Sequence, residues 1–511
     1  MLNIEALTDA LFLLSDWKVY LFIIVGIVYG LIMGAIPGIS ATLAIGLMLV
    51  PSMYMTPIQA IVFLSSVYTS AVYGGGVTAT VFNMPGAPGA VATTFDGYQL
   101  TKKGRQNFAL GLGLISSFIG VFISYGLLFF FMQPLGAFVL KFGPPEMLMI
   151  VLLALTIIGL VQGSFVKSLV AGFFGLLLGT IGMSTLGQPR GTFGFYELYD
   201  GLPLVPTVIG LFAISELFYL IKQNTLVTDD KEVSQRNKRT PSEFLKEIFE
   251  GFKEGLKHRM VLFKGSIIGV VVGLLPAAGS SIASLLSYSQ VQESAKDKSQ
   301  FGKGDPRGIV ASETANNASE AGAMATTLAF SIPGGGAAAV LLSAFLMHGM
   351  IPGPYLVRDS MDFVYAFIIS NFLQAIVLLL VGIIFIYYFA RIVYVPTKLL
   401  IPAIFAMTVI GTYSIIQSMV YPFVALIFGV IGYIMRKLEY PVVSVVMGII
   451  LGSMVESEFL RTYRLFSDDL FAVFSRPLFT ILFIGNILIL IYIAVKKIKG
   501  AKANNEQNAN I

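Results

Sequence analysis

The chain has no cysteine, and only two of its 511 residues are histidine. The lack of cysteine excludes disulfides and thiolate metal sites. The histidines, His258 and His348, lie far apart in the sequence and form no H-E-x-x-H pair, so they do not indicate a zinc protease. The sequence also lacks a G-x-x-x-x-G-K-[ST] phosphate loop, which argues against ATP hydrolysis. We therefore expect no catalytic residues, no enzyme activity and no cofactor.

Charged residues are also scarce, at 12% of the chain, whereas soluble domains carry roughly 25%. Hydrophobic residues make up 56%, and the mean hydropathy is +0.83. Runs such as VYLFIIVGIVYGLIMGAIPG and NFLQAIVLLLVGIIFIYYFA approach or reach the roughly 20 residues that span a bilayer core. We predict an all-α polytopic membrane protein with about eleven or twelve membrane segments. The net charge of +5 is typical of basic cytoplasmic loops and does not indicate nucleic-acid binding.

One hydrophilic stretch, residues 222–259, divides the apolar segments. Within it Thr240, Pro241 and Glu243 predict a capping box with proline at the first helical position. An apolar stripe follows on one helical face, made by Phe244, Leu245, Ile248, Phe249, Phe252 and Leu256. The stripe predicts a helix lying in the membrane interface; packing on another cytoplasmic element is the alternative. The chain then divides into a first transmembrane repeat (1–222), a linker with this helix (223–260), a second repeat (261–497) and a polar tail (498–511).

The two halves that flank the linker resemble each other. Gly34-x-x-Pro37 in the first half corresponds to Gly273-x-x-Pro276 in the second, and each is followed by small polar residues. A second break then comes at NMPGAPG, around Pro85, and at SIPGGG, around Pro333. Matching interrupted segments in two halves predict two inverted repeats, with broken helices or re-entrant hairpins at a transporter binding site. Chance similarity is the alternative, since Gly and Pro are common in membrane helices.

Irregular backbone at membrane depth is tolerated only where protein or a water-filled cavity satisfies its polar groups. The freed N–H groups and half-helix N-termini favour an anion, whereas freed carbonyls favour a small cation such as Na⁺. The predicted substrate-binding residues are Pro37, Gly38, Ser40, Asn83, Pro85, Gly86, Thr94, Pro276, Gly279, Ser280, Asn316, Asn317, Pro333, Gly334, Gly335 and Gly336. The candidate cation ligands are Thr42, Asp96, Ser281 and Glu313.

Some of these residues have a second interpretation. Asp96 could instead cap the turn that follows it. Lys102, Lys103 and Arg105 could meet a carboxylate, but a solvated basic loop is the favoured interpretation. Glu313, close to the Asn pair on one helix, is either a functional carboxylate within the membrane or an interfacial one.

Two long motifs resemble a known family. NMPGAPGAVATTFDGYQLTKKG and FGKGDPRGIVASETANNASEAGAMATTLAFSIPGGGAAAVLLSAFLMHGMIPGP are similar to stretches of the large membrane subunit of tripartite tricarboxylate transporters, the TctA family. The resemblance extends over nearly the whole chain. It departs from the family pattern at Gln99, where proline is usual, at Ala277, where glycine is usual, and at Ser312, where proline is common.

The resemblance implies a multi-pass permease of the bacterial cytoplasmic membrane, surrounded by lipid. Its partners would be a small four-helix membrane subunit and a periplasmic binding protein. It would take up a di- or tricarboxylate, driven by a Na⁺ or H⁺ gradient, and an elevator motion is expected by analogy with other anion transporters. A Gly-rich anion channel and an intramembrane enzyme are the alternatives. Two mirrored sites favour alternating access over an open pore.

Overall fold

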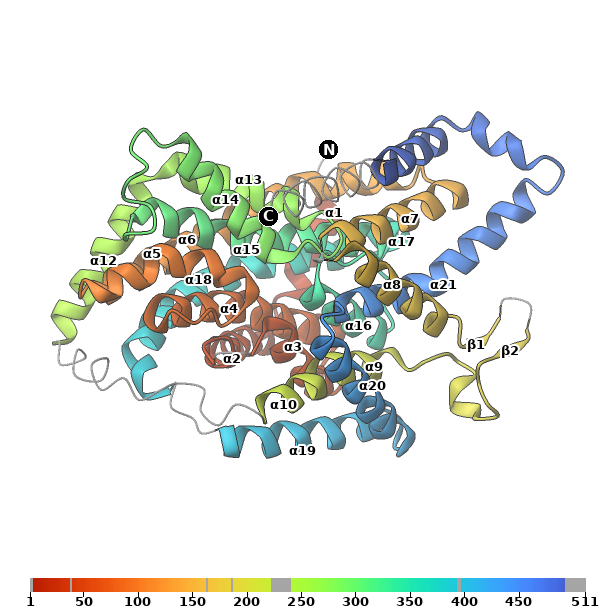
Figure 1. The fold of residues 1–511 in the computed structure, drawn as a ribbon, viewed down its shortest axis with the longest axis horizontal. Helices are drawn as coiled ribbons and strands as arrows, with labels where there is room; N and C mark the ends of the chain where they lie inside the picture. The colour runs from red at the N-terminus through yellow and green to blue at the C-terminus, as the bar shows by residue number, and fades with distance from the viewer. Residues whose placement is uncertain are drawn as a thin grey trace, which may run out of the picture. The chain divides into compact units, whose positions relative to one another are not determined.

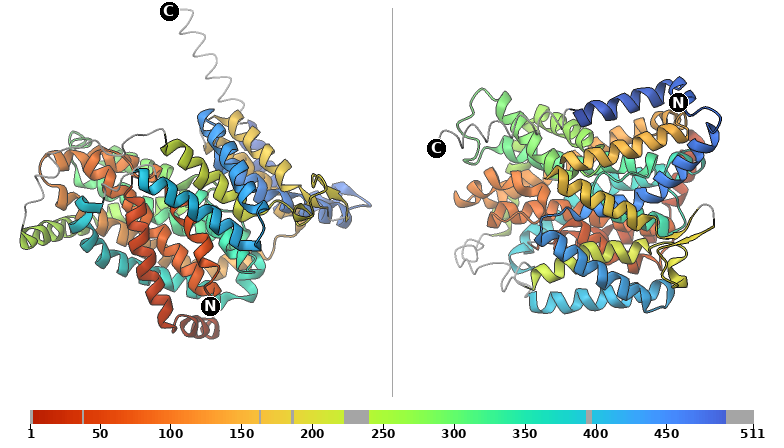
Figure 2. Two further views of the ribbon diagram at one scale, coloured as in Figure 1. Left: turned by 90° about the horizontal axis from the view of Figure 1, so that it is seen from below. Right: turned by 45° about the vertical axis from the view of Figure 1, so that its right-hand side comes forward.

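The structure is a computed structural model that describes residues 3–36, 39–161, 164–184, 187–221, 240–392 and 397–491. Almost all regular structure in these residues is helical (Figure 1, Figure 2). Strands β1 (Gly182–Met183) and β2 (Pro189–Arg190) form a two-stranded antiparallel sheet. Six of the described helices are long and apolar enough to cross a membrane, and seven shorter helices are also apolar. The prediction of an all-α polytopic membrane protein is confirmed.

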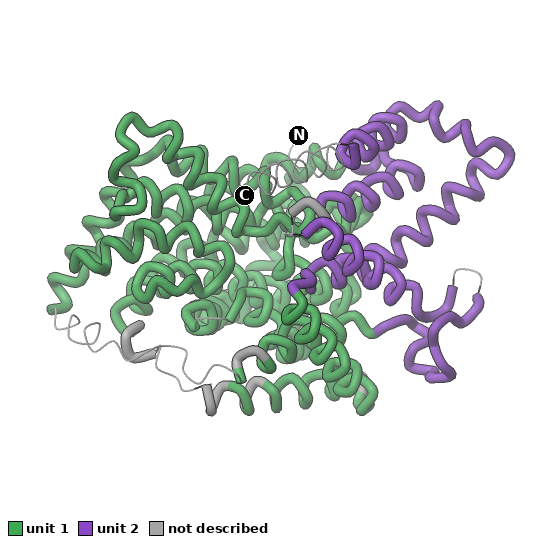
Figure 3. Tube along the Cα trace, viewed as in Figure 1, with its two compact units in different colours: residues 1–137, 203–438 green, residues 138–202, 439–511 purple. Residues whose placement is uncertain are grey.

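The chain folds into two compact units (Figure 3). Unit 1 comprises residues 1–137 and 203–438, and unit 2 comprises residues 138–202 and 439–511. Unit 1 contains α1 (Ile4–Leu13), α2 (Trp17–Gly34), α3 (Ala41–Ser52), α4 (Pro57–Phe82), η1 (Pro88–Ala90), α5 (Val91–Lys102), nearly all of α6 (Gln106–Val139), α9 (Leu204–Ile209), η3 (Gly210–Ile214), α10 (Ser215–Leu220), α12 (Pro241–Lys257), α13 (Arg259–Gly273), α14 (Gly279–Ser294), α15 (Pro306–Phe330), α16 (Gly336–Met347), α17 (Pro354–Asp359), α18 (Met361–Ile392), α19 (Thr397–Ile416) and α20 (Val420–Lys437). Unit 2 contains α7 (Pro144–Val161), α8 (Phe165–Gly179), the sheet, η2 (Tyr196–Leu198), α21 (Val442–Leu465) and η4 (Leu470–Ser475).

Unit 2 is built around the packing of α8 on α21. A Cβ at Gly179 would lie 2.6 Å from the carbonyl oxygen of Ile449, so the backbones of these two helices are in close contact. The buried carboxylate of Glu146 on α7 pairs with Arg476 at 2.5 Å. Small residues and this ion pair together hold the unit compact.

The core of unit 1 is formed by α4 and α15, which are buried along nearly their whole length. Helix α2 packs along α4, and α13 packs along α15. Each outer helix carries three glycines at four-residue spacing on the face toward its partner: Gly26, Gly30 and Gly34 on α2, and Gly265, Gly269 and Gly273 on α13. A Cβ at Gly30 would lie 2.5 Å from the carbonyl oxygen of Val67, and one at Gly269 would lie 2.7 Å from that of Ala315. Both pairs therefore use the close small-residue packing of membrane helices.

Helix α12 begins with the predicted capping box, in which the Thr240 N–H donates to Glu243 and the Glu243 N–H donates to the Thr240 hydroxyl. Its apolar stripe is split. Phe244, Ile248 and Phe252 are buried, whereas Leu245, Phe249 and Leu256 are exposed. The buried side packs against α6, because a Cβ at Gly111 would lie 2.5 Å from the Ile248 carbonyl oxygen. The location of α12 in the membrane interface stays a prediction, and residues 222–239 and 498–511 lie outside the described residues.

Candidate functional site

The first predicted break follows α4. The helix ends at Asn83, whose φ of 57° places it in the left-handed region. Pro85 comes next, and the chain returns to α4 through a hydrogen bond from the Gly86 N–H to the Gly75 carbonyl, at 3.2 Å. A Cβ at Gly86 would lie 2.5 Å from the carbonyl oxygen of Gly34, at the end of α2. The break therefore rests on the last turn of the neighbouring helix, where only glycine fits.

The second break, after α15, repeats this geometry. The helix ends at Ser331, again with a φ of 57°. Pro333 and Gly334 follow, and a Cβ at Gly334 would meet the Gly273 carbonyl at the end of α13 and lie 2.7 Å from the Ala323 Cα. Corresponding positions thus make corresponding contacts in the two halves, which supports the predicted repeat. An inverted relation between the halves stays a prediction.

Each break also contacts the other half of the chain. A Cβ at Gly89, in η1, would meet the side chains of Ser280 on α14 and Asn316 on α15. A Cβ at Gly336, the first residue of α16, would lie 3.0 Å from the Thr42 hydroxyl on α3. The structure therefore brings predicted residues of one half of the chain against residues of the other half.

These contacts link four helix N-termini, those of η1, α3, α14 and α16. Thr42 and Gly336 join α3 to α16, and the Gly279 N–H donates to the Gly334 carbonyl at 3.3 Å, which joins α16 to α14. Ser40 caps α3 by accepting a hydrogen bond from the Leu43 N–H at 3.3 Å. Helix N-termini carry partial positive charge, so N-termini that are linked in this way favour an anion.

The left-handed residue before α14 is Ala277, with a φ of 57°. Glycine would adopt this conformation without the steric cost that a Cβ imposes. The departure from the family pattern at this position therefore leaves the backbone in a glycine-like conformation. Pro276 beside it is buried, and Pro37 and Gly38, the corresponding residues of the first half, lie outside the described residues.

Asn316 is the most conspicuous polar side chain beside these N-termini. It is 1% exposed, and both of its amide atoms lack a hydrogen-bond partner within the described residues. Ser284 and Ser287 of α14 are likewise buried with unpartnered hydroxyls. Buried polar groups without partners are costly, and each points to a ligand or water that completes its bonds.

A cavity of about 480 Å³ reaches the first break. It is lined by neutral residues: Asn83, Thr94, Phe95, Gln99, Tyr288, Gln292, Phe301 and Gly302. Asn83 and Thr94 were both predicted as site residues, and Gln99 stands where the family has proline. The cavity offers an uncharged surface of mixed polar and aromatic side chains next to the break.

Among the candidate cation ligands, Asp96 has its carboxylate occupied. It accepts hydrogen bonds from the Gly304 N–H at 2.7 Å, the Asp305 N–H at 2.8 Å and the Tyr288 hydroxyl at 2.9 Å. The carboxylate thus binds the loop that leads into α15. The alternative prediction, that Asp96 caps the turn that follows it, considered only neighbouring residues and did not include this distant loop. Ser281 is half-buried in the first turn of α14.

Glu313 and Asn317 lie on α15 and are both buried. Glu313 accepts hydrogen bonds from the Thr93 and Ser117 hydroxyls at 2.5 and 3.1 Å. The Asn317 amide donates to the Thr69 carbonyl at 3.2 Å. Gly89, Thr69, Ser117, Tyr125 and Glu320 also lie in this region and are absent from the predicted site, because the contacts that bring them together join distant parts of the chain.

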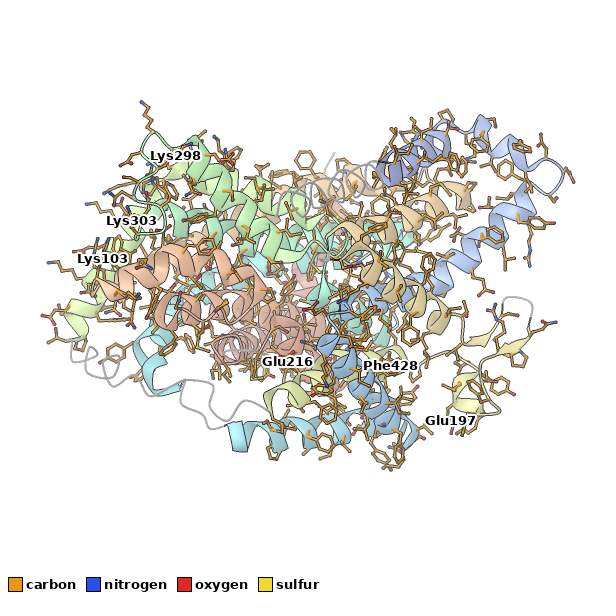
Figure 4. The ribbon with its side chains drawn as sticks, in the orientation of Figure 1. Lys103, Glu197, Glu216, Lys298, Lys303 and Phe428 are labelled. Carbon is orange, nitrogen blue, oxygen red and sulfur yellow. The ribbon has the colours of Figure 1, made fainter. Side chains whose placement is uncertain are left out.

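The basic residues after α5 lie at one edge of unit 1. Lys103 donates to the Lys303 carbonyl at 2.6 Å (Figure 4 labels both lysines). Lys102 and Arg105 are exposed, as expected of a solvated basic loop. The corresponding contact of the other half joins His348, after α16, to the backbone of Ser52 at the end of α3.

Comparison with known proteins identifies a family and two relatives. The family described as "Tripartite tricarboxylate transporter TctA family" matches residues 20–447. An Agrobacterium vitis protein, "Uncharacterized 52.8 kDa protein in TAR-I ttuC' 3'region", is 30% identical over 456 residues, which cover 89% of each chain. A second protein from that organism, "Uncharacterized protein in TAR-II ttuC' 3'region", is 25% identical over 210 residues, covering 41% of this chain and 87% of its own. No solved structure matches the chain. The matched span covers most of the sequence and both breaks, so this multi-pass membrane protein belongs to the TctA family of tripartite tricarboxylate transporters.

Proposed function

We propose that the chain is the permease subunit of an uptake system for a small organic anion, a di- or tricarboxylate. The observation that carries this proposal is the series of contacts that links four helix N-termini, of which that of η1 lies beside Asn316, whose buried amide is unpartnered within the described residues. The N–H groups and partial positive charge of the N-termini favour a carboxylate. The Asn316 amide and the Ser280 hydroxyl supply further hydrogen bonds that fix its orientation.

The same N-termini explain the need for a co-transported cation. Their first residues read ATLA, PGAV, GSSI and GAAA, so no side chain there carries charge. Dipoles alone balance a polyanion poorly, and a co-bound Na⁺ or H⁺ would neutralise it. The gradient of that cation would then drive uptake.

Membership of the TctA family supports the proposed partners. A small four-helix membrane subunit and a periplasmic binding protein would complete the system in the bacterial cytoplasmic membrane. Alternating access would arise from movement of the two broken-helix halves as one core, an elevator-like motion. The close glycine packing of α2 on α4 and of α13 on α15 supports such a core, because it makes each half stiff.

The test is uptake of [¹⁴C]citrate into vesicles that contain this chain, the membrane subunit and the binding protein. An imposed Na⁺ or proton gradient should concentrate citrate inside above its outside level. A channel would only equilibrate citrate, and uptake that needs internal ATP while both gradients are collapsed would contradict the proposal.

A further inference from the structure

Helix α15 carries two carboxylates in the core of unit 1. Glu313 and Glu320 are each 1% exposed, and in the described part of the chain neither pairs with Lys, Arg or His. A carboxylate inside a membrane protein is costly and is usually retained for function. The two differ in how their oxygens are bonded.

Glu313 has one donor for each oxygen. Its Oε1 accepts from the Thr93 hydroxyl at 2.5 Å, and its Oε2 accepts from the Ser117 hydroxyl at 3.1 Å. An ionised carboxylate accepts hydrogen bonds on both oxygens and donates none. The surroundings of Glu313 therefore match one protonation state, the charged one.

Glu320 is bonded on one side only. Its Oε1 accepts from the Thr69 hydroxyl at 2.7 Å and from the Tyr125 hydroxyl at 3.0 Å. Its Oε2 is buried and has no partner among the described residues. One oxygen thus accepts two hydrogen bonds, and the other accepts none from the described residues.

A second bare oxygen lies three residues earlier on the same helix. The Asn317 Nδ2 donates to the Thr69 carbonyl at 3.2 Å, which fixes the orientation of the amide and leaves its Oδ1 unpartnered in the described chain. Asn317 and Glu320 are neighbours on the helix surface because residues three apart share a face. Two acceptor oxygens cannot bond each other, but a proton on Glu320 Oε2 would create a donor for Asn317 Oδ1.

We propose that Glu320 takes up and releases the proton whose gradient drives transport. Thr69 and Tyr125 stabilise its ionised form, and Asn317 accepts from its protonated form. This inference rests on the proposed function and names its coupling ion. Sodium fits less well, because hard cations are bound by a shell of several oxygen ligands and, among the described residues, Glu320 Oε2 and Asn317 Oδ1 are the oxygens of this pair that lack a partner.

The groups that face Glu320 do not supply a competing charge. Among the described residues, the titratable side chains that interact electrostatically with it are Tyr68 of α4 and Tyr125 of α6. Tyrosine ionises near pH 10 in water, so both are neutral at the pH of uptake. Glu320 is therefore the group in this cluster that changes charge.

The test uses vesicles with the complete system, [¹⁴C]citrate outside and a pH-sensitive dye inside. In wild type, a proton gradient should concentrate citrate, and citrate entry should carry protons that the dye records. Glu320→Gln keeps the shape of the protonated side chain but cannot change charge. We expect its gradient-driven accumulation to fall about 5- to 150-fold and its proton signal to disappear, whereas exchange of citrate at equal pH continues.

Two further variants keep the inference falsifiable. Glu216→Gln alters a buried carboxylate that is paired with Arg436, and it should leave proton coupling intact. Tyr125→Phe removes one donor to the ionised carboxylate, so it should shift the pH dependence of uptake to higher pH; it carries the test if Glu320→Gln does not reach the membrane.

The outcomes separate the two proposals. If Glu320→Gln accumulates citrate and gives a proton signal to the same extent as wild type, Glu320 does not have the proposed role. The proposed function would still stand. An unshifted pH profile for Tyr125→Phe would also count against Glu320. Failure of wild type to accumulate citrate under either gradient overturns the proposed function itself.

Discussion

Replacement of Gly86 by alanine tests the geometry of the first break. A Cβ there would lie 2.5 Å from the Gly34 carbonyl oxygen and 2.8 Å from the Gly75 Cα. Ordinary non-bonded contacts are about 3.5–4.0 Å, so the break would have to withdraw by about 1 Å. That shift would stretch the hydrogen bond from the Gly86 N–H to the Gly75 carbonyl. Overpacking of this kind typically costs about 1–3 kcal/mol.

The assay compares Gly86→Ala with Gly46→Ala, a change in α3 where the added Cβ would meet nothing within 4 Å. Gly46→Ala should keep the melting temperature and citrate uptake of wild type. Gly86→Ala should lower both, and uptake per folded molecule should fall further than stability because the break lies beside the proposed substrate site. If the two variants are indistinguishable in melting temperature and uptake, the close approach at Gly86 is not what the fold or transport requires.

Three other changes test separate features. Asn316→Ala should weaken citrate binding about 5- to 150-fold, the cost of one lost hydrogen bond, yet leave stability unchanged or higher because two unpartnered atoms disappear; equal affinity would exclude Asn316 from the site. Ala277→Gly should raise the free energy of unfolding by up to about 1 kcal/mol, since glycine relieves the left-handed φ, and chemical denaturation measures this. In this cysteine-free chain, a cysteine at Ser299, beside Lys298 and Lys303, should react with an impermeant reagent only from the cytoplasmic side; reaction from the periplasmic side contradicts the expectation that basic loops face the cytoplasm.

The breaks and helix starts could be predicted from the sequence because local chemistry determines them. Proline has no N–H to donate, so Pro85 and Pro333 mark where α4 and α15 end. Thr240 with Glu243 marks the start of α12, and the capping box forms as predicted. In each case the deciding interaction lies within a few residues of the motif.

The partners of the site residues could not be predicted, because they come from distant parts of the chain. Asp96 is occupied by the backbone of residues 304 and 305, and nothing near it in sequence indicates this. The close approach in the second break lies at Gly334, whereas a Cβ at Gly335 would meet only the Gly279 Cα, at 3.6 Å. A run of three glycines does not tell which one faces a neighbouring backbone. Packing decides that.

The glycine stripes of α2 and α13 combine a pattern that is visible in the sequence with contacts that only the structure shows. Their four-residue spacing in GIVYGLIMG and GSIIGVVVG is visible in the sequence, and it places three glycines on one face of each helix. The structure adds their purpose. Close packing brings the last glycine of each stripe, Gly34 or Gly273, against the break of the same half at Gly86 or Gly334. A stripe that only joined two helices could end anywhere along them. Both stripes instead end at the glycine whose carbonyl lies against the break. We therefore infer that each stripe positions its break, so that α2 supports the break after α4 and α13 supports the break after α15.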